Sequence, residues 1–367
     1  MADEEPPRKR RVRYRGTHPR AFHEKYKELN PDQYQADTRK VIERGQTPAG
    51  THRPIMVGEI LKALDPKPGD VGVDATLGFG GHSERLLRRI LPGGHLHGLD
   101  VDPLEMPRTE ERLRGLGYTA EQFTAHRMNF AGIGSVRAMA DRGFDFIMAD
   151  LGVSSMQIDN PARGFTFKAQ GPLDLRLNPS HGRPASSLIK SCSEDDLAMM
   201  LIENSDEPFA EEIARAIRSR RDSMETTLQL ADAVRAALKH KDKEEVGVSL
   251  QRTFQAFRIA VNDEFGSLDR LLAMLPRCLA PGGRVAILSF HSGEDRRVKK
   301  SFQAYTRAGI FANAVRDPIR PSAEERRANP RSAPAKLRWA TMGDRAARDD
   351  GDDAHDGDTA ESGEGEA

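Results

Sequence analysis

A glycine-rich segment flanked by two aspartates has the clearest chemical signature in the sequence. Gly78, Gly80 and Gly81 follow an apolar run that ends at Asp74, and Asp100 ends a second apolar run about 20 residues later. Because glycine has no Cβ atom, the backbone N–H groups of such a loop can approach a ligand closely. An acid at the position of Asp100 can accept hydrogen bonds from both hydroxyls of a ribose. The pattern predicts a nucleotide-like ligand.

The acidic residue before the glycines discriminates between such ligands. A dinucleotide would bring its pyrophosphate to the N-terminus of the following helix, where the carboxylate of Asp74 would repel it. S-adenosylmethionine has no phosphate and carries a positive sulfonium and a positive ammonium, so a carboxylate at the strand end suits it. With Asp100 at its offset, the spacing favours S-adenosylmethionine and a class I methyltransferase over an ordinary glycine-rich turn.

The flanking residues predict the elements that position this segment. Apolar, β-rich runs that begin at Val71 and His95 enclose an amphipathic helical pattern, which makes a β-loop-α-β unit. Further strands are expected at 123–128, 144–150 and 283–290. Roughly 130 residues separate the last two, whereas a crossover normally needs about 30. We therefore expect an α/β fold, Rossmann-like with a mostly parallel sheet, and a small helical domain inserted before the fifth strand.

The expected organisation has four parts. They are a disordered basic extension (1–48), a methyltransferase domain that binds S-adenosylmethionine (49–157 and 250–343), an inserted helical domain for substrate recognition (158–249) and a disordered acidic tail (344–367). Apolar residues at alternating spacings of three and four from Thr253 to Leu275 predict one long helix packed on the sheet. A strand is also expected at 336–341.

Composition excludes several classes of protein. The chain is 37% hydrophobic and 31% charged, its apolar runs are strand-length, and its first residues lack the apolar core of a signal peptide, so we expect a cytoplasmic protein without a membrane span. Cys192 and Cys278 are the only cysteines, and they lie too far apart in the sequence to form a paired metal-binding motif, which excludes a cysteine-based zinc site. His95 and His97 would share one face of a strand, but no third ligand is evident, and we expect no metal.

Three other strand ends carry candidate residues. Phe130 follows the third strand, where it would flank an adenine or pack in the core. Asp150 ends the fourth strand, where it would accept a hydrogen bond from a reacting amine or contact the cofactor. His291 follows the fifth strand. It would accept a proton at neutral pH, hold the substrate base, or serve as a structural histidine.

Aromatic and basic residues suggest contacts with nucleic acid. Phe165 and Phe167, interleaved with Arg163, would stack an unpaired base, as in single-stranded RNA recognition, or pack the hinge of the inserted domain. Arg252 and Arg258 belong to a polar helix stripe that would meet a nucleic acid or face solvent. The candidates for RNA binding are Arg163, Phe165, Phe167, Arg176, Arg252 and Arg258.

A set of motifs that is collinear from about residue 52 to residue 341 resembles one family, the bacterial small-subunit (16S) ribosomal RNA cytosine-N4 methyltransferases of the MraW type. The motifs are His52-x-Pro-Ile-Met56, Asp74-Ala-Thr-Leu-Gly-Phe-Gly-Gly-His-Ser83, Ala149-Asp-Leu-Gly-Val-Ser-Ser155 with Gln157, Arg163-Gly-Phe-Thr-Phe167, Pro172-Leu-Asp-Leu-Arg176, Arg252-Thr-Phe-Gln255, Val261-Asn-Asp-Glu264, Ser289-Phe-His-Ser292 with Glu294-Asp-Arg296, and Asn329-Pro-Arg331. The sequence departs from the family pattern at Gly293, at Ala333-Pro334 and at Asn204-Ser-Asp-Glu207.

The resemblance implies methylation of a specific cytidine at N4, in the decoding centre of small-subunit ribosomal RNA, with S-adenosylmethionine as cofactor. The expected partner is small-subunit ribosomal RNA, within the assembled or late-assembling 30S particle or as naked RNA, and neither a membrane nor a metal is expected. The cofactor contacts that it implies are through Gly80, Gly81, His82, Asp100, Phe130, Asp150 and Gln157. For Asp150 the family favours the cofactor contact. A methyltransferase of DNA or protein would lack the distal motifs, and a non-catalytic regulator would keep only the cofactor loop.

Overall fold

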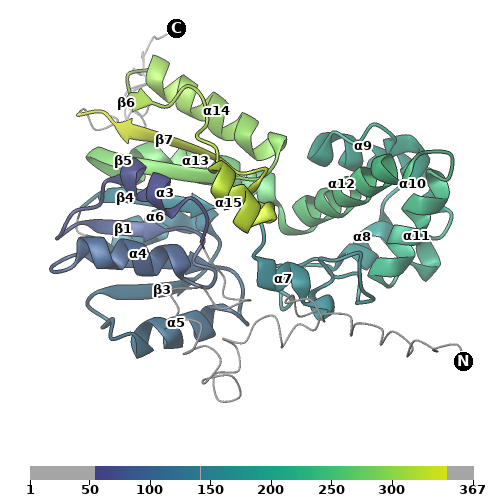
Figure 1. Cartoon of the computed structure of the whole chain (residues 1–367), viewed down its shortest axis with the longest axis horizontal. Helices are drawn as coiled ribbons and strands as arrows, with labels where there is room; N and C mark the ends of the chain where they lie inside the picture. Colours follow the sequence, from purple (N-terminus) through teal and green to yellow (C-terminus); the bar gives the residue numbers. More distant parts are fainter. Residues whose placement is uncertain (1–53, 141, 345–367) are drawn as a thin grey trace, which may run out of the picture.

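The computed structural model describes residues 54–140 and 142–344, so the predictions for the extension 1–48 and for nearly all of the tail 344–367 lie outside the described residues. Its centre is a sheet in the order β3-β2-β1-β4-β5-β7-β6 (Figure 1). The strands are β1 (Val71–Asp74), β2 (His95–Asp100), β3 (Phe123–Arg127), β4 (Phe144–Asp150), β5 (Leu279–Ser289), β6 (Phe311–Ala314) and β7 (Lys336–Met342). β7 pairs antiparallel with β5 and β6, and the other neighbours pair parallel. The mostly parallel α/β fold is confirmed.

Helices cover both faces of this sheet. One face packs on α3 (Val57–Leu64), α4 (Gly81–Ile90) and α5 (Met106–Gly115), and the other packs on α6 (Ile133–Met139), α13 (Glu264–Cys278) and α14 (Ser292–Arg307). A parallel sheet buried on both faces needs nearly continuous apolar strands, and Phe144, Phe146 and Ile147 of β4 are all fully buried. The carboxyl ends of the central strands therefore meet at one edge, where ligands of open α/β sheets bind.

The inserted domain forms a separate helical lobe beside the sheet (Figure 1). It contains α8 (Ala185–Ser191), α9 (Glu194–Ser205), α10 (Ala210–Arg218), α11 (Thr227–Ala237) and α12 (Lys243–Asn262), and it has its own apolar core. Short helices α7 (Ser155–Asp159) and α15 (Ala323–Ala328) lie at its junction with the sheet domain. Among the described residues, no helix is both long and apolar enough to cross a bilayer.

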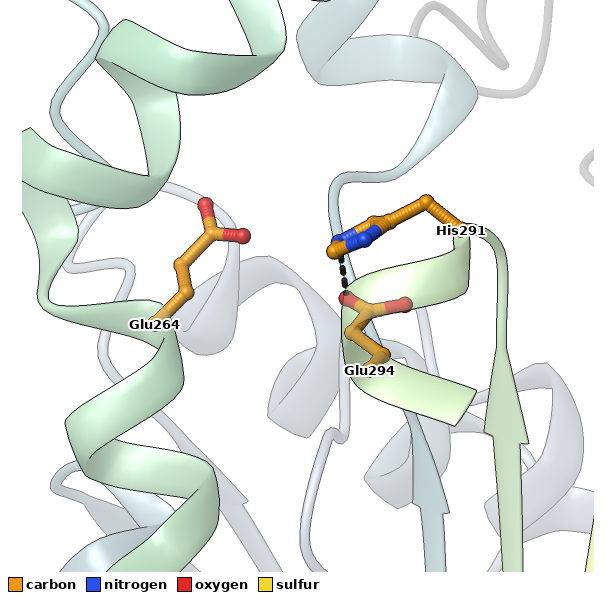
Figure 2. Close-up of side chains that lie close together, drawn as sticks. All are labelled: Glu264, His291 and Glu294. Carbon is orange, nitrogen blue, oxygen red and sulfur yellow. Dashed lines mark ion pairs between the residues drawn. The ribbon is translucent and has the colours of Figure 1, made fainter. Parts of the chain in front are cut away.

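The long helix predicted over 253–275 is wrong, because the chain forms two helices there. Asp263, with φ of 48°, separates α12 from α13. Phe254 and Phe257 of α12 pack in the inserted domain, so the boundary predicted at 249/250 falls inside a helix that belongs to the insertion. A helix packed on the sheet and a helix packed in the inserted domain show the same apolar spacing. The spacing therefore gave no sign of the break. The break places Glu264 across from His291, in the loop after β5, and from Glu294, in the first turn of α14 (Figure 2).

A third histidine, which the sequence did not indicate, lies beside His95 and His97. His126 of β3 joins them, with 3.0 Å between its Nε2 and Nδ1 of His97. His95 is hydrogen-bonded to the carbonyl of Glu121 at 2.7 Å and to Thr124 Oγ1 at 3.1 Å. Burial, together with the neighbouring rings, lowers the pKa of His97 to about 4.

This histidine cluster predicts acid sensitivity of folding. Below the ordinary histidine pKa of about 6.5 the unfolded chain takes up a proton that folded His97 refuses until about pH 4, so stability falls as pH decreases through that window. After a discount for the partial exposure of His97, the loss between pH 7 and pH 5 is about 1 kcal/mol. Urea denaturation of His97→Asn should show a smaller loss than the native chain. The exposed His240→Asn is the control, and equal losses in all three chains would contradict this assignment.

Candidate active site

The glycine loop between β1 and α4 has the backbone that its sequence predicts. Gly78 and Gly80 have positive φ angles of 49° and 74°, and Gly80 is the N-cap residue of α4. A Cβ atom at Gly80 would lie 2.8 Å from Thr109 Cγ2, so only glycine fits there. Arg112 fixes the loop from α5 by donating to the carbonyl of Phe79 at 2.8 and 3.1 Å. The loop is thus held rigidly against α5 before any ligand binds.

Asp74 makes internal hydrogen bonds at the end of β1. Its side chain is 1% exposed, and it accepts hydrogen bonds from Ser83 Oγ at 2.6 Å and from the backbone N–H of Thr76 at 3.1 Å. Burial raises its pKa. A carboxylate enclosed in this way ties the end of β1 to α4. It therefore shapes the glycine loop, and a direct contact between Asp74 and the cofactor stays a prediction.

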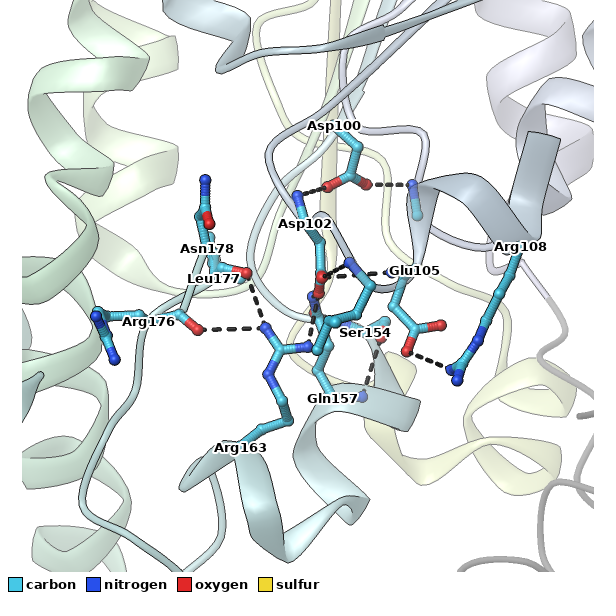
Figure 3. A network of polar contacts seen from close by, with 12 residues as sticks. Asp100, Asp102, Glu105, Arg108, Ser154, Gln157, Arg163, Arg176, Leu177 and Asn178 are labelled. Atoms are coloured by element: carbon cyan, nitrogen blue, oxygen red, sulfur yellow. Dashed lines mark hydrogen bonds and ion pairs between the residues drawn. The ribbon is translucent and has the colours of Figure 1, made fainter. Parts of the chain in front are cut away.

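Asp100 links the ends of two loops, as Figure 3 shows. It accepts hydrogen bonds from the backbone N–H of Gly78 at 2.7 Å and of Asp102 at 2.8 Å. Burial raises the pKa of Asp100 to about 6, although both hydrogen bonds lower it. The carboxylate is therefore ionised at pH 7 and still has acceptor capacity for a ribose.

This pKa makes cofactor binding pH-dependent. If the ribose hydroxyls donate to the ionised carboxylate, affinity for S-adenosylmethionine should fall as pH drops below about 6, by about tenfold between pH 7 and pH 5. Asp100→Ala should bind at least about tenfold more weakly at pH 7, since a charge-assisted hydrogen bond contributes about 1.5–3 kcal/mol, and its affinity should be flat over this range. Calorimetric titration of the folded variant measures both effects, and an unchanged dissociation constant would remove Asp100 from the site.

A buried ion pair next to Asp100 corrects the assignment of Arg163 to RNA. Arg163 is 6% exposed, and its Nη1 lies 2.7 Å from Asp102 Oδ2, while Nη2 donates to the carbonyls of Arg176 and Leu177 at 3.2 and 2.8 Å (Figure 3). Its charge is neutralised inside the protein and is not available to a phosphate. Arg163 joins the end of β2 to the first loop of the inserted domain.

Gln157 belongs to the same network. Its Nε2 donates to Asp102 Oδ2 at 2.8 Å, and its Oε1 accepts from the backbone N–H of Ser154 at 2.9 Å, which completes the cap of α7. At 9% exposure, Gln157 supports the loop after β4. A direct contact between Gln157 and the cofactor stays a prediction.

Two buried polar atoms without partners lie where the glycine loop meets the end of β4. His82 Nε2 and Asp150 Oδ1 make no hydrogen bond within the described part of the chain, and His82 Nε2 lies 3.5 Å from Asp150 Oδ2. The backbone N–H of Asp150 donates to Thr76 Oγ1 at 2.6 Å, which fixes the strand end. Buried atoms of this kind are rare in folded proteins, and a catalytic role is one of the reasons for them.

The remaining cofactor and RNA candidates are distributed between core and surface. Phe130 is partly buried against the sheet core, and Phe165 is 8% exposed in the core of the inserted domain. The ring of Phe167 lies 5.4 Å from that of Phe254, so packing of the insertion, which was the alternative, explains both Phe165 and Phe167. Arg176 pairs with Asp174 at 2.7 Å. The roles of Phe130, Arg176 and Arg252 stay predictions.

The loop after β5 brings together residues to which the sequence assigned no joint role. His291 Nε2 lies 3.1 Å from Glu294 Oε1, and Glu264 faces both from α13 (Figure 2). Arg258 forms a bidentate pair with Glu264 at 2.7 and 2.8 Å, so its expected role as an RNA contact is replaced by an internal one. Glu264 and Glu294 lie within the motifs that resemble the family, and this resemblance was the only feature of the sequence that could have pointed to them.

The departure from the family pattern at Gly293 has a local explanation. A Cβ atom there would lie 2.5 Å from Cζ of Phe265 and 3.3 Å from Nδ1 of His291. The aromatic ring of Phe265 therefore occupies the room that a larger residue at 293 would need. The guanidinium of Arg297 lies over this ring, with its Cζ 3.7 Å from the ring centroid. The ring of Phe265 can therefore pack beside His291 only because residue 293 is a glycine.

Comparisons with known proteins agree with these features. The family model described as "MraW methylase family" matches residues 49–342. The chain is 54% identical over 347 residues to "Ribosomal RNA small subunit methyltransferase H 2" of Alkaliphilus metalliredigens, with 93% of this chain and 99% of the relative covered. It is 52% identical over 345 residues to "Ribosomal RNA small subunit methyltransferase H 1" of Lachnoclostridium phytofermentans, with 92% and 94% covered.

Proposed function

The chain belongs to the MraW methylase family, and we propose that it transfers one methyl group from S-adenosylmethionine to the exocyclic N4 of a specific cytidine in small-subunit ribosomal RNA. Its methyl donor is S-adenosylmethionine, as the family and the aspartate-flanked glycine loop indicate together. The names of its relatives support the ribosomal RNA substrate. We also propose that the methylated atom is N4, that the cytidine lies in the decoding centre, and that the substrate is a 30S particle in the cytoplasm.

The unsatisfied buried atoms His82 Nε2 and Asp150 Oδ1 are the observation that best supports the proposed reaction. Methyl transfer is an in-line displacement, so the protein contributes mainly by aligning the nucleophile with the methyl group and the sulfur. The lone pair of a cytosine N4 is delocalised into its ring, and a hydrogen-bond acceptor is needed to draw it toward the methyl group. Asp150 Oδ1 is a buried acceptor without a donor beside the glycine loop. As the methyl group passes from sulfur to nitrogen, the adjacent carboxylate of Asp150 would stabilise the positive charge that develops on the amine and would accept the proton that the amine then loses.

The inserted domain would select the cytidine. It joins the sheet domain at the loop after β4, beside the strand ends where the cofactor binds. A base enclosed in folded RNA must leave its stack before it reaches a methyl group, so recognition should depend on RNA shape and on an extruded nucleotide. The phosphate contacts that accompany such recognition weaken steeply with added salt.

Small subunits from a strain that lacks the modification provide the test. Purified protein and labelled S-adenosylmethionine should yield N4-methylcytidine at one position, identified by nuclease digestion and mass spectrometry. Asp150→Ala should reduce kcat by about 100-fold or more, as loss of a catalytic hydrogen-bonding group does, whereas Cys192→Ser, away from the strand ends, should leave it unchanged. Comparison of naked RNA with assembled particles identifies the substrate form. Label on C5, on a ribose hydroxyl or only on protein would contradict the proposal.

A further inference from the structure

We propose that Glu264, His291 and Glu294 bind one divalent transition-metal cation. The three side chains come from α13 and from the loop and helix that follow β5 (Figure 2). One potential ligand atom from each residue lies within 4.8 Å of the others. The sequence predicted no metal site, because these residues are brought together only by the fold. This proposal goes beyond methyl transfer and does not depend on the identity of the RNA substrate.

The distance between His291 and Glu294 is that of two ligand atoms on one metal ion, and the contact lacks the geometry of a hydrogen bond. His291 Nε2 lies 3.1 Å from Glu294 Oε1, yet neither ring nitrogen of His291 makes a hydrogen bond within the described residues. The His291 side chain is 10% exposed, and both of its ring nitrogens are buried. Metal–ligand bonds of about 2.0–2.2 Å separate neighbouring donor atoms by roughly 3–3.5 Å. A cation between the two side chains would give both nitrogen and oxygen a partner.

The carboxylates are oriented by other groups, as in established metal sites. Arg258 donates to both oxygens of Glu264 at 2.7 and 2.8 Å. The backbone N–H of Phe290 donates to Glu294 Oε2 at 2.8 Å and leaves Oε1 turned toward His291. Hydrogen bonds from such supporting residues fix ligand orientation and strongly affect metal affinity.

Charge also favours a cation at this position. The charges of Glu264, Glu294 and Arg258 sum to one negative charge, in a place where the Glu294 side chain is 4% exposed and that of Glu264 is 12% exposed. Uncompensated charge in such surroundings is costly. An imidazole combined with carboxylates suits Mn²⁺, Fe²⁺ or Zn²⁺ better than Mg²⁺ or Ca²⁺, which prefer ligand sets made entirely of oxygen. A His291 that binds a cation through Nε2 cannot also accept the substrate proton there.

Binding of Mn²⁺ to the full chain tests the site. Protein freed of metal with a chelator is titrated with Mn²⁺ and followed by the electron paramagnetic resonance signal of the free ion, without methyl donor or RNA. We expect one equivalent to bind and Zn²⁺ to displace it. His291→Ala and Glu294→Gln should each weaken binding by at least about tenfold. The matched control is His240→Ala, since His240 lies 3.7 Å from Glu212 in an exposed pair of the same chemistry, and this variant should bind normally.

Several results would overturn the metal site. They are the absence of saturable Mn²⁺ and Zn²⁺ binding by the native chain, binding that persists in both folded variants, and binding that is lost in His240→Ala. Circular dichroism shows whether the variants fold. If they do not, the native chain provides the test, because a bound cation must raise its Tm and a chelator must reverse the rise. The proposed methylation of RNA would stand in either case.

Discussion

Replacement of Arg163 by alanine should destabilise the protein by about 3–5 kcal/mol, because it removes the partner of a carboxylate that cannot reach water. Asp102 is fully buried, and apart from Arg163 its side chain accepts only from Gln157 and from the backbone amides of Leu104 and Glu105 within the described residues. Its own backbone N–H donates to Asp100. The loss should therefore also weaken binding of S-adenosylmethionine, although Arg163 itself need not touch it.

Denaturation in urea measures the Arg163 effect against a matched ion pair. Arg215 lies 3.3 Å from Glu194, with side chains that are 67% and 42% exposed, so Arg215→Ala should cost less than about 1 kcal/mol. Asp102→Asn combined with Arg163→Ala should recover part of the loss, since the double variant removes the unpaired charge. A loss below about 1 kcal/mol for Arg163→Ala would show that Asp102 finds another partner or takes up a proton.

Gly80→Asp should abolish detectable methyl transfer. At φ of 74° a residue with a side chain is strained, and its Cβ atom would lie 2.8 Å from Thr109 Cγ2. Strain costs about 1–3 kcal/mol and overpacking a similar amount, so affinity for S-adenosylmethionine should fall by roughly 30-fold or more through distortion of the loop. Calorimetry and a methylation assay measure the two effects separately.

A second glycine provides the control for Gly80→Asp. Gly247 lies in α12, and a Cβ atom there would meet nothing within 4 Å. Gly247→Ala should therefore keep full cofactor affinity and stabilise the helix by up to about 1 kcal/mol. Normal binding and methylation by a folded Gly80→Asp variant would show that the glycine loop does not hold the methyl donor.

The sequence alone determined the features that depend on residues close together in the chain. The β1 loop and the strand ends at Asp74, Asp100 and Asp150 agree with the structure, because alternating apolar patterns and glycine spacing are local properties. The collinear motifs also indicated the family, as the match over 49–342 confirms. Edge strand β6 was missed, since four residues with two exposed positions carry little periodicity.

Only the tertiary structure decided which distant side chains meet. Apolar spacing shows that a helix has a buried face without showing which core receives it, and for that reason the helix break at Asp263 was hidden. Arg163 looked like a cation for RNA because a sequence cannot show that Asp102, 61 residues away, takes up its charge. In the same way, His126 reaches His97 through strand pairing, and Glu264 reaches His291 and Glu294 through helix packing. Long-range packing sets the electrostatic surroundings of each group, and those surroundings decide whether a charge faces a ligand or is neutralised inside the protein.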